Sequence, residues 1–102
     1  MGNGQSAAAA EMRRLIWSPG ALDDLIGIQA HIAGFNPAAA RRFFVRLRAA
    51  GMSLVDFRDR GRPVGNGRRE LTIVRPYLLR YVVVGDEVRI LSVRHAARRR
   101  VP

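Results

Sequence analysis

Apolar residues in the first half of the chain recur every three or four positions, which is the spacing of a buried helical face. Ser18 and Asn36 are each followed by a proline, so a capping side chain precedes a residue suited to the first helical position. Gly34 is a natural helix end between them. The sequence therefore predicts two helices whose short link, around Phe35, makes them an antiparallel hairpin.

Each predicted helix carries one apolar stripe, and the stripe of the second is continuous from Ala40 to Leu54. Arginines occupy much of the remaining surface of that helix. We expect the two stripes to face a common core with the sheet. The side chains predicted to line this core are Leu22, Leu25, Ile26, Phe43, Phe44, Leu47 and Leu54.

The periodicity changes after a segment rich in glycine, arginine and proline, Arg58 to Arg69, which is interpreted as turns. β-Branched and aromatic runs follow, with Gly85-Asp86 as a hairpin turn between the last two. The predicted strands are Arg13 to Trp17, Glu70 to Val74, Tyr77 to Val84 and Glu87 to Arg94. The fold class is α+β: an N-terminal strand, an antiparallel helical hairpin and a three-stranded antiparallel meander, in the order β-α-α-β-β-β.

The length of 102 residues suits a single domain, which we expect over residues 12–102. Residues 1–11 are small, polar and alanine-rich, and are interpreted as a disordered leader or tag remnant. No apolar stretch approaches the roughly 20 residues of a membrane span, and no export signal is recognised. With no cysteine in the chain, these features predict a cytoplasmic protein without a membrane partner.

Charge is the strongest compositional signal, since 18 basic residues, all arginine, oppose 8 acidic ones. A formal net charge of +10 attracts nucleic acid or an acidic protein partner, although an all-arginine balance also fits a GC-rich genome. One basic cluster closes the chain: Arg94, His95, Arg98, Arg99 and Arg100. A second set lies in the second helix, the loop and the sheet: Arg41, Arg60, Arg62, Arg68, Arg69 and Arg80.

Several short segments of the sequence resemble those of a known protein family and occur in the same order. They are WSPGALDDLIGIQAHI from Trp17, NPAAARRFFVRL from Asn36, GRP from Gly61, REL from Arg69, YLLRYVV from Tyr77, DEVRI from Asp86 and VRHAAR from Val93. In this order and spacing the chain resembles the RelE/ParE superfamily of bacterial type II toxins, most closely its ParE branch. The resemblance covers about residues 13–100.

The resemblance implies a toxin neutralised by an acidic, ParD-like antitoxin whose carboxy-terminal segment wraps over it, as a hetero-oligomer. It also implies one of two activities, because RelE-like members cut messenger RNA on the ribosome whereas ParE-like members poison DNA gyrase. The closing cluster is the expected contact with the target, and the second arginine set is the expected contact with the antitoxin. The alternative interpretation of both sets is a solvated charged surface.

The two activities differ in what the site must contain, because RNA cleavage needs an acid, a base and cations for the phosphate. RelE-like ribonucleases tend to place an arginine early in the third strand and a histidine or tyrosine at the end of the last strand. This chain has Leu78, Ala96 and Ala97 at the matching positions.

His95 is one position from this place, and a shift of one residue in a strand turns a side chain to the other face. His31, Tyr77 and Tyr81 are explained as well by helix surface and core as by chemistry. We therefore expect a gyrase inhibitor with no catalytic residue, metal, cofactor or small-molecule substrate. A RelE-like endoribonuclease and a plain nucleic-acid-binding module remain the alternatives.

Overall fold

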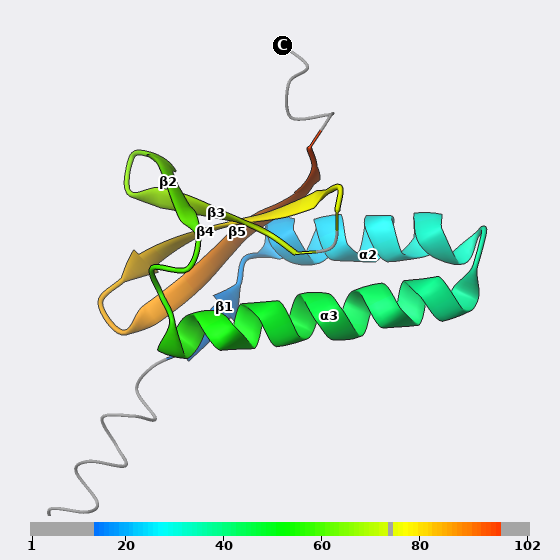
Figure 1. The fold of residues 1–102 in the computed structure, drawn as a ribbon, viewed down its shortest axis with the longest axis horizontal. Coiled ribbons are helices and arrows are strands. Elements are labelled where there is room, and N and C mark those ends of the chain that lie inside the picture. Colours follow the sequence, from blue (N-terminus) through cyan, green and yellow to red (C-terminus); the bar gives the residue numbers. More distant parts are fainter. Residues whose placement is uncertain (1–13, 74, 97–102) are drawn as a thin grey trace, which may run out of the picture.

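The computed structural model describes residues 14–73 and 75–96, and consists of one mixed sheet and a helical hairpin packed on it (Figure 1). The predicted order of strand, two helices and antiparallel meander is confirmed, with one strand added. The elements are β1 (Arg14–Trp17), α2 (Pro19–Ala33), α3 (Pro37–Asp56), β2 (Arg62–Gly65), β3 (Arg68–Thr72), β4 (Tyr77–Val84) and β5 (Glu87–His95). Within these residues no helix is long and apolar enough to cross a membrane.

The helix boundaries follow the predicted start signals. The Ser18 hydroxyl accepts a hydrogen bond from the Ala21 amide at 3.0 Å, and the Asn36 side chain accepts one from the Ala39 amide at 3.1 Å. Each cap is followed by proline, and Gly34 ends α2. These local interactions leave only Gly34 to Asn36 to reverse the chain, so the two helices run antiparallel.

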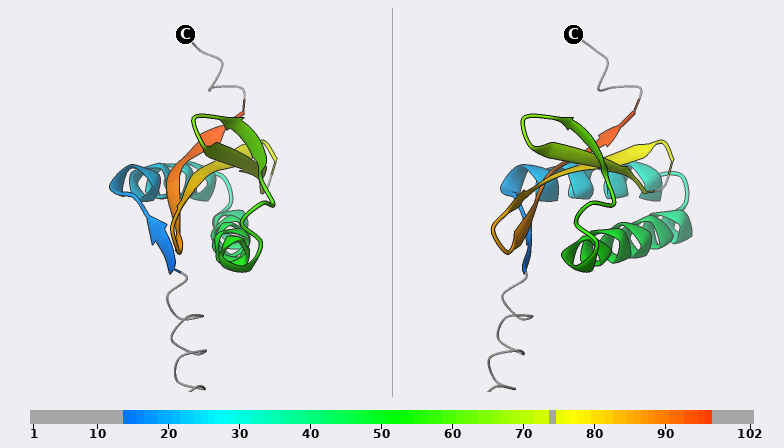
Figure 2. Two further views of the ribbon diagram at one scale, coloured as in Figure 1. Left: turned by 90° about the vertical axis from the view of Figure 1, so that its left-hand side faces the viewer. Right: turned by 60° about the vertical axis from the view of Figure 1, so that its left-hand side comes forward.

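The sheet has the strand order β1-β5-β4-β3-β2 and twists across the helical hairpin (Figure 2). β1 pairs in parallel with β5, whereas the other pairs are antiparallel. A register shift between β4 and β5 leaves Leu91 without a partner residue across the strand pair. The Leu91 carbonyl accepts a hydrogen bond from the Ser18 hydroxyl at 3.1 Å, which joins the start of α2 to β5.

The sequence predicted turns throughout the segment Arg58 to Arg69, and this prediction was wrong for part of it. The segment contains β2 and the start of β3, joined through Asn66 and Gly67, which both have positive φ. Pro63 is compatible with β2 because this strand lies at the edge of the sheet, where an amide hydrogen can be missing. The following strand accordingly begins at Arg68 and ends at Thr72, and not at Glu70 and Val74; residue 74 lies outside the described residues.

The core lies between the hairpin and one face of the sheet. Four of the predicted core residues belong to it: Leu25, Phe43, Leu47 and Leu54 are buried, and Phe44 is half-buried against them. The sheet contributes Leu79, Tyr81, Val88, Ile90 and Val93. The prediction was wrong for Leu22 and Ile26, which are 44% and 64% exposed. The apolar stripe of α2 is wider than the part of the helix that the sheet covers.

Candidate target and partner surfaces

The face of the sheet opposite the helices, here called the open face, is rich in arginine. Side chains alternate along a strand, so Arg80 points away from the core that receives its neighbours Leu79 and Tyr81. The cross-strand register aligns further residues with it. The open face includes Arg62, Arg68, Glu70, Leu78, Arg80, Val82, Glu87, Arg89 and Arg94.

Glu70 organises the arginines of this face. Its side chain is only 2% exposed, and its Oε2 accepts hydrogen bonds from Arg80 Nε at 3.1 Å and Nη2 at 2.5 Å. Arg62 Nη2 lies 3.5 Å from the other carboxylate oxygen. A buried carboxylate is stable only with such partners. Glu70 is therefore held between two cations of the open face.

The residues predicted to contact the target do not share one surface. Arg94 is exposed and pairs across the strands with Leu78, on the open face. His95 pairs with Tyr77, and their rings meet edge to face with centroids 5.4 Å apart on the helix side of the sheet. Arg98, Arg99 and Arg100, like Ala97, lie outside the described residues.

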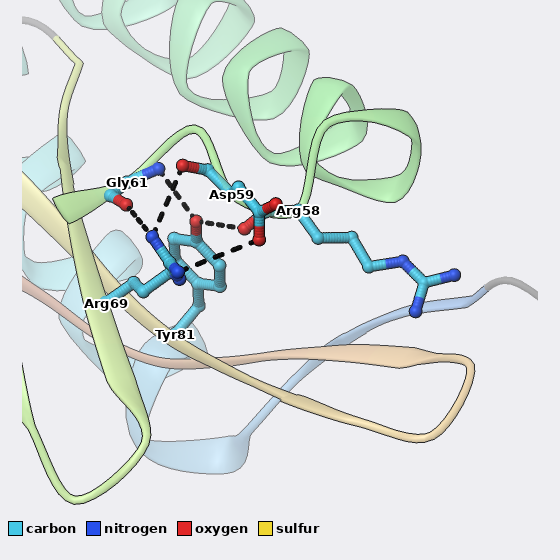
Figure 3. Close-up of polar contacts among 5 residues, drawn as sticks. All are labelled: Arg58, Asp59, Gly61, Arg69 and Tyr81. Atoms are coloured by element: carbon cyan, nitrogen blue, oxygen red, sulfur yellow. Dashed lines mark hydrogen bonds and ion pairs between the residues drawn. The ribbon is translucent and has the colours of Figure 1, made fainter. Parts of the chain in front are cut away.

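The loop between α3 and β2 is fixed by a buried hydroxyl (Figure 3). The Tyr81 hydroxyl donates to the Arg58 carbonyl at 2.6 Å and accepts from the Gly61 amide at 2.8 Å. Arg69 Nη1 donates to the Gly61 carbonyl at 2.6 Å, and its Nη2 lies 3.7 Å from the Asp59 carboxylate. Burial raises the pKa of Tyr81, so its phenol stays neutral and keeps donating to the loop.

Gly61 is required at this position by close packing. A Cβ atom there would lie 2.7 Å from a ring carbon of Tyr81 and 2.9 Å from the Glu70 carbonyl oxygen. We expect Gly61→Ala to lower the free energy of unfolding by about 1–3 kcal/mol, because the added methyl displaces the loop or the ring. Gly27→Ala is the matched control: its Cβ meets nothing within 4 Å, so it should match or exceed wild type. Equal denaturation midpoints for wild type and Gly61→Ala would contradict this packing.

The residues predicted to contact the antitoxin are likewise dispersed. Arg62 and Arg80 flank Glu70, whereas Arg69 donates a hydrogen bond to the Gly61 carbonyl in the loop between α3 and β2. Arg60 donates to the Ser53 hydroxyl at 2.7 Å, and Arg41 is exposed on α3. Arg68 is half-buried on β3, with Val82 as its cross-strand partner. The structure thus brings Arg62 and Arg80 together and separates them from Arg41.

A small apolar groove, whose position the sequence does not indicate, lies beside the helical hairpin. It has a volume of about 170 Å³ and is lined by Trp17, Leu22, Leu25, Phe44 and Arg48. Leu22 was assigned to the core, but it forms one wall of this groove and Arg48 places a cation there. The sequence signal that could have indicated the groove is the width of the apolar stripe of α2, which leaves Leu22 exposed beside the core.

A second and larger cavity, with a volume of about 660 Å³, lies where α2 meets the ends of β4 and β5. It brings together His31, Tyr77 and His95, which sequence reasoning considered one at a time. Asp23, Asp24 and Arg94 also line it. These residues are up to 72 positions apart in the sequence, so only the packing of α2 on β5 could reveal their proximity.

Three comparisons relate this chain to known proteins. Residues 15–100 match the family model described as the ParE toxin of the type II toxin–antitoxin system parDE. A protein named Toxin RelE2, from Caulobacter vibrioides, is 42% identical over 87 residues, which are 85% of this chain and 99% of that protein. A solved structure titled "Chromosomal ParDE TA system from P. aeruginosa" has a TM-score of 0.73 and 29% identity, with 82% of this chain and 96% of that chain covered.

Proposed function

This chain belongs to the ParE toxin family of type II toxin–antitoxin systems, and we propose that it arrests growth by inhibiting DNA gyrase. The family match spans residues 15–100 and thus nearly all of the described fold. It makes the chain a toxin with an antitoxin partner. The choice of gyrase over messenger RNA as the target is our inference from the open face.

The chemistry of the open face is the observation that supports gyrase. Leu78 occupies the position at which RelE-like ribonucleases tend to carry an arginine, and its cross-strand partner is Arg94. The acids of this face are paired with arginines: Glu70 with Arg80 and Arg62, and Glu87 with Arg89. His95 is turned to the opposite side of the strand, against Tyr77. Among the described residues of this face each acid is paired with arginine, an arrangement that suits binding better than RNA cleavage.

RNA cleavage remains the second candidate, for one reason. The relative from Caulobacter vibrioides carries the name Toxin RelE2 and is 42% identical to this chain. If that name reflects a ribonuclease, the acid and base here would have to come from residues other than those of the open face.

The exposed arginines of the open face are the proposed contacts with the gyrase–DNA complex. Arg94 is exposed at the end of this face, and an arginine fork binds phosphate or carboxylate in two-point geometry. Arg98, Arg99 and Arg100 are expected from the sequence to extend the contact. Their removal together should weaken inhibition without affecting the core, because the core residues all precede them.

The groove of Trp17, Leu22, Leu25, Phe44 and Arg48 is the proposed docking site for the antitoxin. Its exposed apolar wall fits aliphatic anchors of a partner segment, and Arg48 fits a carboxylate beside them. The net charge of +10 favours an acidic partner and accelerates its association at low salt. Arg41 lies on the same helix and would extend the charged rim.

The test of the gyrase proposal uses the purified full chain, gyrase and supercoiled plasmid. We expect cleaved DNA to accumulate with the chain present and messenger RNA to stay intact in cells that express it. Arg94→Glu should reduce DNA cleavage at least about tenfold, since it removes a charge-assisted contact and adds repulsion. Arg42→Glu, exposed on α3, is the matched control. Arrest with cut messenger RNA and unaffected gyrase would refute gyrase as the target.

A further inference from the structure

The cavity between α2 and the ends of β4 and β5 shares only Arg94 with the proposed gyrase contact. Its volume is about 660 Å³, which is large enough for a nucleotide-sized group. Two hydrogen bonds hold α2 against β5. The Ser18 hydroxyl donates to the Leu91 carbonyl outside the lining, and Asp24 Oδ2 accepts from the Val93 amide at 3.0 Å in the cavity wall. The two elements on either side of the cavity, α2 and β5, are therefore joined by hydrogen bonds.

Aromatic rings form a large part of the lining. Tyr77 meets His95 edge to face with centroids 5.4 Å apart, and meets the core residue Phe43 at 5.1 Å. His31 is held edge to face by Phe35, with centroids 5.0 Å apart. Tyr77 is thus packed between the core and His95, whereas His31 contacts only the exposed ring of Phe35. Aromatic rings are the surface on which proteins stack single-stranded bases.

The polar groups of the lining select among the bases. Asp23 is exposed and has no hydrogen bond or ion pair among the described residues, so both of its carboxylate oxygens can accept. Guanine is the base whose edge presents two adjacent donors, the ring N–H and the amino group, which match two carboxylate oxygens. Arg94 contributes to the same lining and can pair with a phosphate.

Space for the ligand is created at Gly27. A Cβ built on this glycine meets no atom within 4 Å, so the helix surface is open here. Glycine inside a helix lowers helix stability by about 1 kcal/mol relative to alanine. Its presence in α2, facing the cavity, is not explained by the packing of the helix.

We propose that this cavity binds a guanine base of single-stranded nucleic acid, stacked on the Tyr77 and His95 side and held by Asp23 and Arg94. The proposal does not depend on gyrase being the target, because an unpaired guanine occurs in opened DNA as well as in messenger RNA. It adds base recognition to the sequence-independent attraction of the arginines for phosphate.

The binding test uses the full chain with fluorescent tetranucleotides that contain one guanine, adenine or hypoxanthine among thymines or uracils. Hypoxanthine lacks the amino group and so offers only one donor. We expect the guanine probe to bind about 5- to 150-fold more tightly than either other probe. DNA and RNA versions of each probe identify which strand chemistry is preferred. Equal affinity for the three bases would overturn the proposal and leave only phosphate binding.

Two variants locate the site. Gly27→Leu should weaken binding of the guanine probe at least about tenfold by filling the cavity, whereas Ala30→Leu, exposed on the same helix, should not change it. Asp23→Asn should abolish the preference for guanine over hypoxanthine while retaining the salt-dependent part of the affinity. Thermal unfolding of each variant confirms that it is folded.

The outcomes separate this proposal from that of gyrase inhibition. Guanine preference that survives Gly27→Leu would place base recognition elsewhere and refute this cavity. A Gly27→Leu protein that binds every probe normally but loses its antitoxin would identify the cavity as a partner surface, and would equally refute it. DNA cleavage by gyrase, measured separately, can fail or succeed without changing either result.

Discussion

Leu47→Ala should lower the free energy of unfolding by about 2–5 kcal/mol, the range for removing a large buried side chain. Leu47 is fully buried, at 0% exposure, at the centre of the helix face that packs on the sheet. The variant loses the transfer free energy of three carbon atoms and leaves a cavity that fixed neighbours cannot close. Domains of this kind have about 5–15 kcal/mol in total, so the free toxin could approach unfolding.

The measurement is urea denaturation of the isolated chain, with Val45→Ala as control. Val45 lies on the same helix but is 63% exposed, so its truncation should change the stability by no more than about 0.5 kcal/mol. Phe43→Ala, at another buried position of the same face, should resemble Leu47→Ala. If Val45→Ala proved as damaging as Leu47→Ala, the assignment of the buried face of α3 would be wrong.

The helical hairpin was predictable because its signals are local. Ser18 and Asn36 each cap the helix that follows them, and the buried residues of α3, from Ala40 to Leu54, fall at helical spacing on one stripe. The stripe of α2 is broader, and the sequence cannot tell which part of it the sheet covers. Leu25 is buried, whereas Leu22 and Ile26 on the flank remain exposed. Local spacing finds a helix, but only tertiary packing selects among its apolar positions.

The sheet was predictable in its meander and less so at its edges. β4 and β5 are joined by Gly85 at φ 59°, as the Gly-Asp turn signal indicates. β2 was missed because glycine and proline in a sequence indicate turns, and an edge strand tolerates both. The parallel pairing of β1 with β5 joins residues more than 70 positions apart, for which the sequence offers no local signal.

The candidate surfaces were predictable in chemistry and not in position. The sequence indicated that arginines would meet the partners, but the alternation of β5 separates Arg94 from His95. The partners of Glu70 were not predicted, because a single glutamate in a strand does not by itself indicate an ion pair. Its role follows from the cross-strand register that aligns it with Arg80 and Arg62. Pairing register is a property of the folded sheet, so charge alone could not define these surfaces.

Leu22→Arg should release the toxin from its antitoxin, with an affinity lower by at least about 30-fold, or about 2 kcal/mol. This expectation depends on the proposed docking groove. The variant replaces an apolar wall with a second cation beside Arg48, which removes an anchor site and adds repulsion inside the groove. Leu22 is 44% exposed, so the guanidinium can reach solvent in the free toxin and the fold should persist.

Ala49→Arg provides the matched control, because it adds the same charge to an exposed position of α3 outside the groove lining. Titration of each variant with the antitoxin gives the affinity, and co-expression tests whether the antitoxin still protects the cell. Leu22→Arg should kill despite co-expression, since the variant keeps the open face intact and loses only its inhibitor. Loss of both toxicity and binding would instead indicate misfolding, which thermal unfolding detects.

A folded Leu22→Arg protein that binds the antitoxin as tightly as Ala49→Arg would move the docking site away from this groove. The arginines of the open face would then be the surface left to accept an acidic partner, and the antitoxin would compete directly with the target for it.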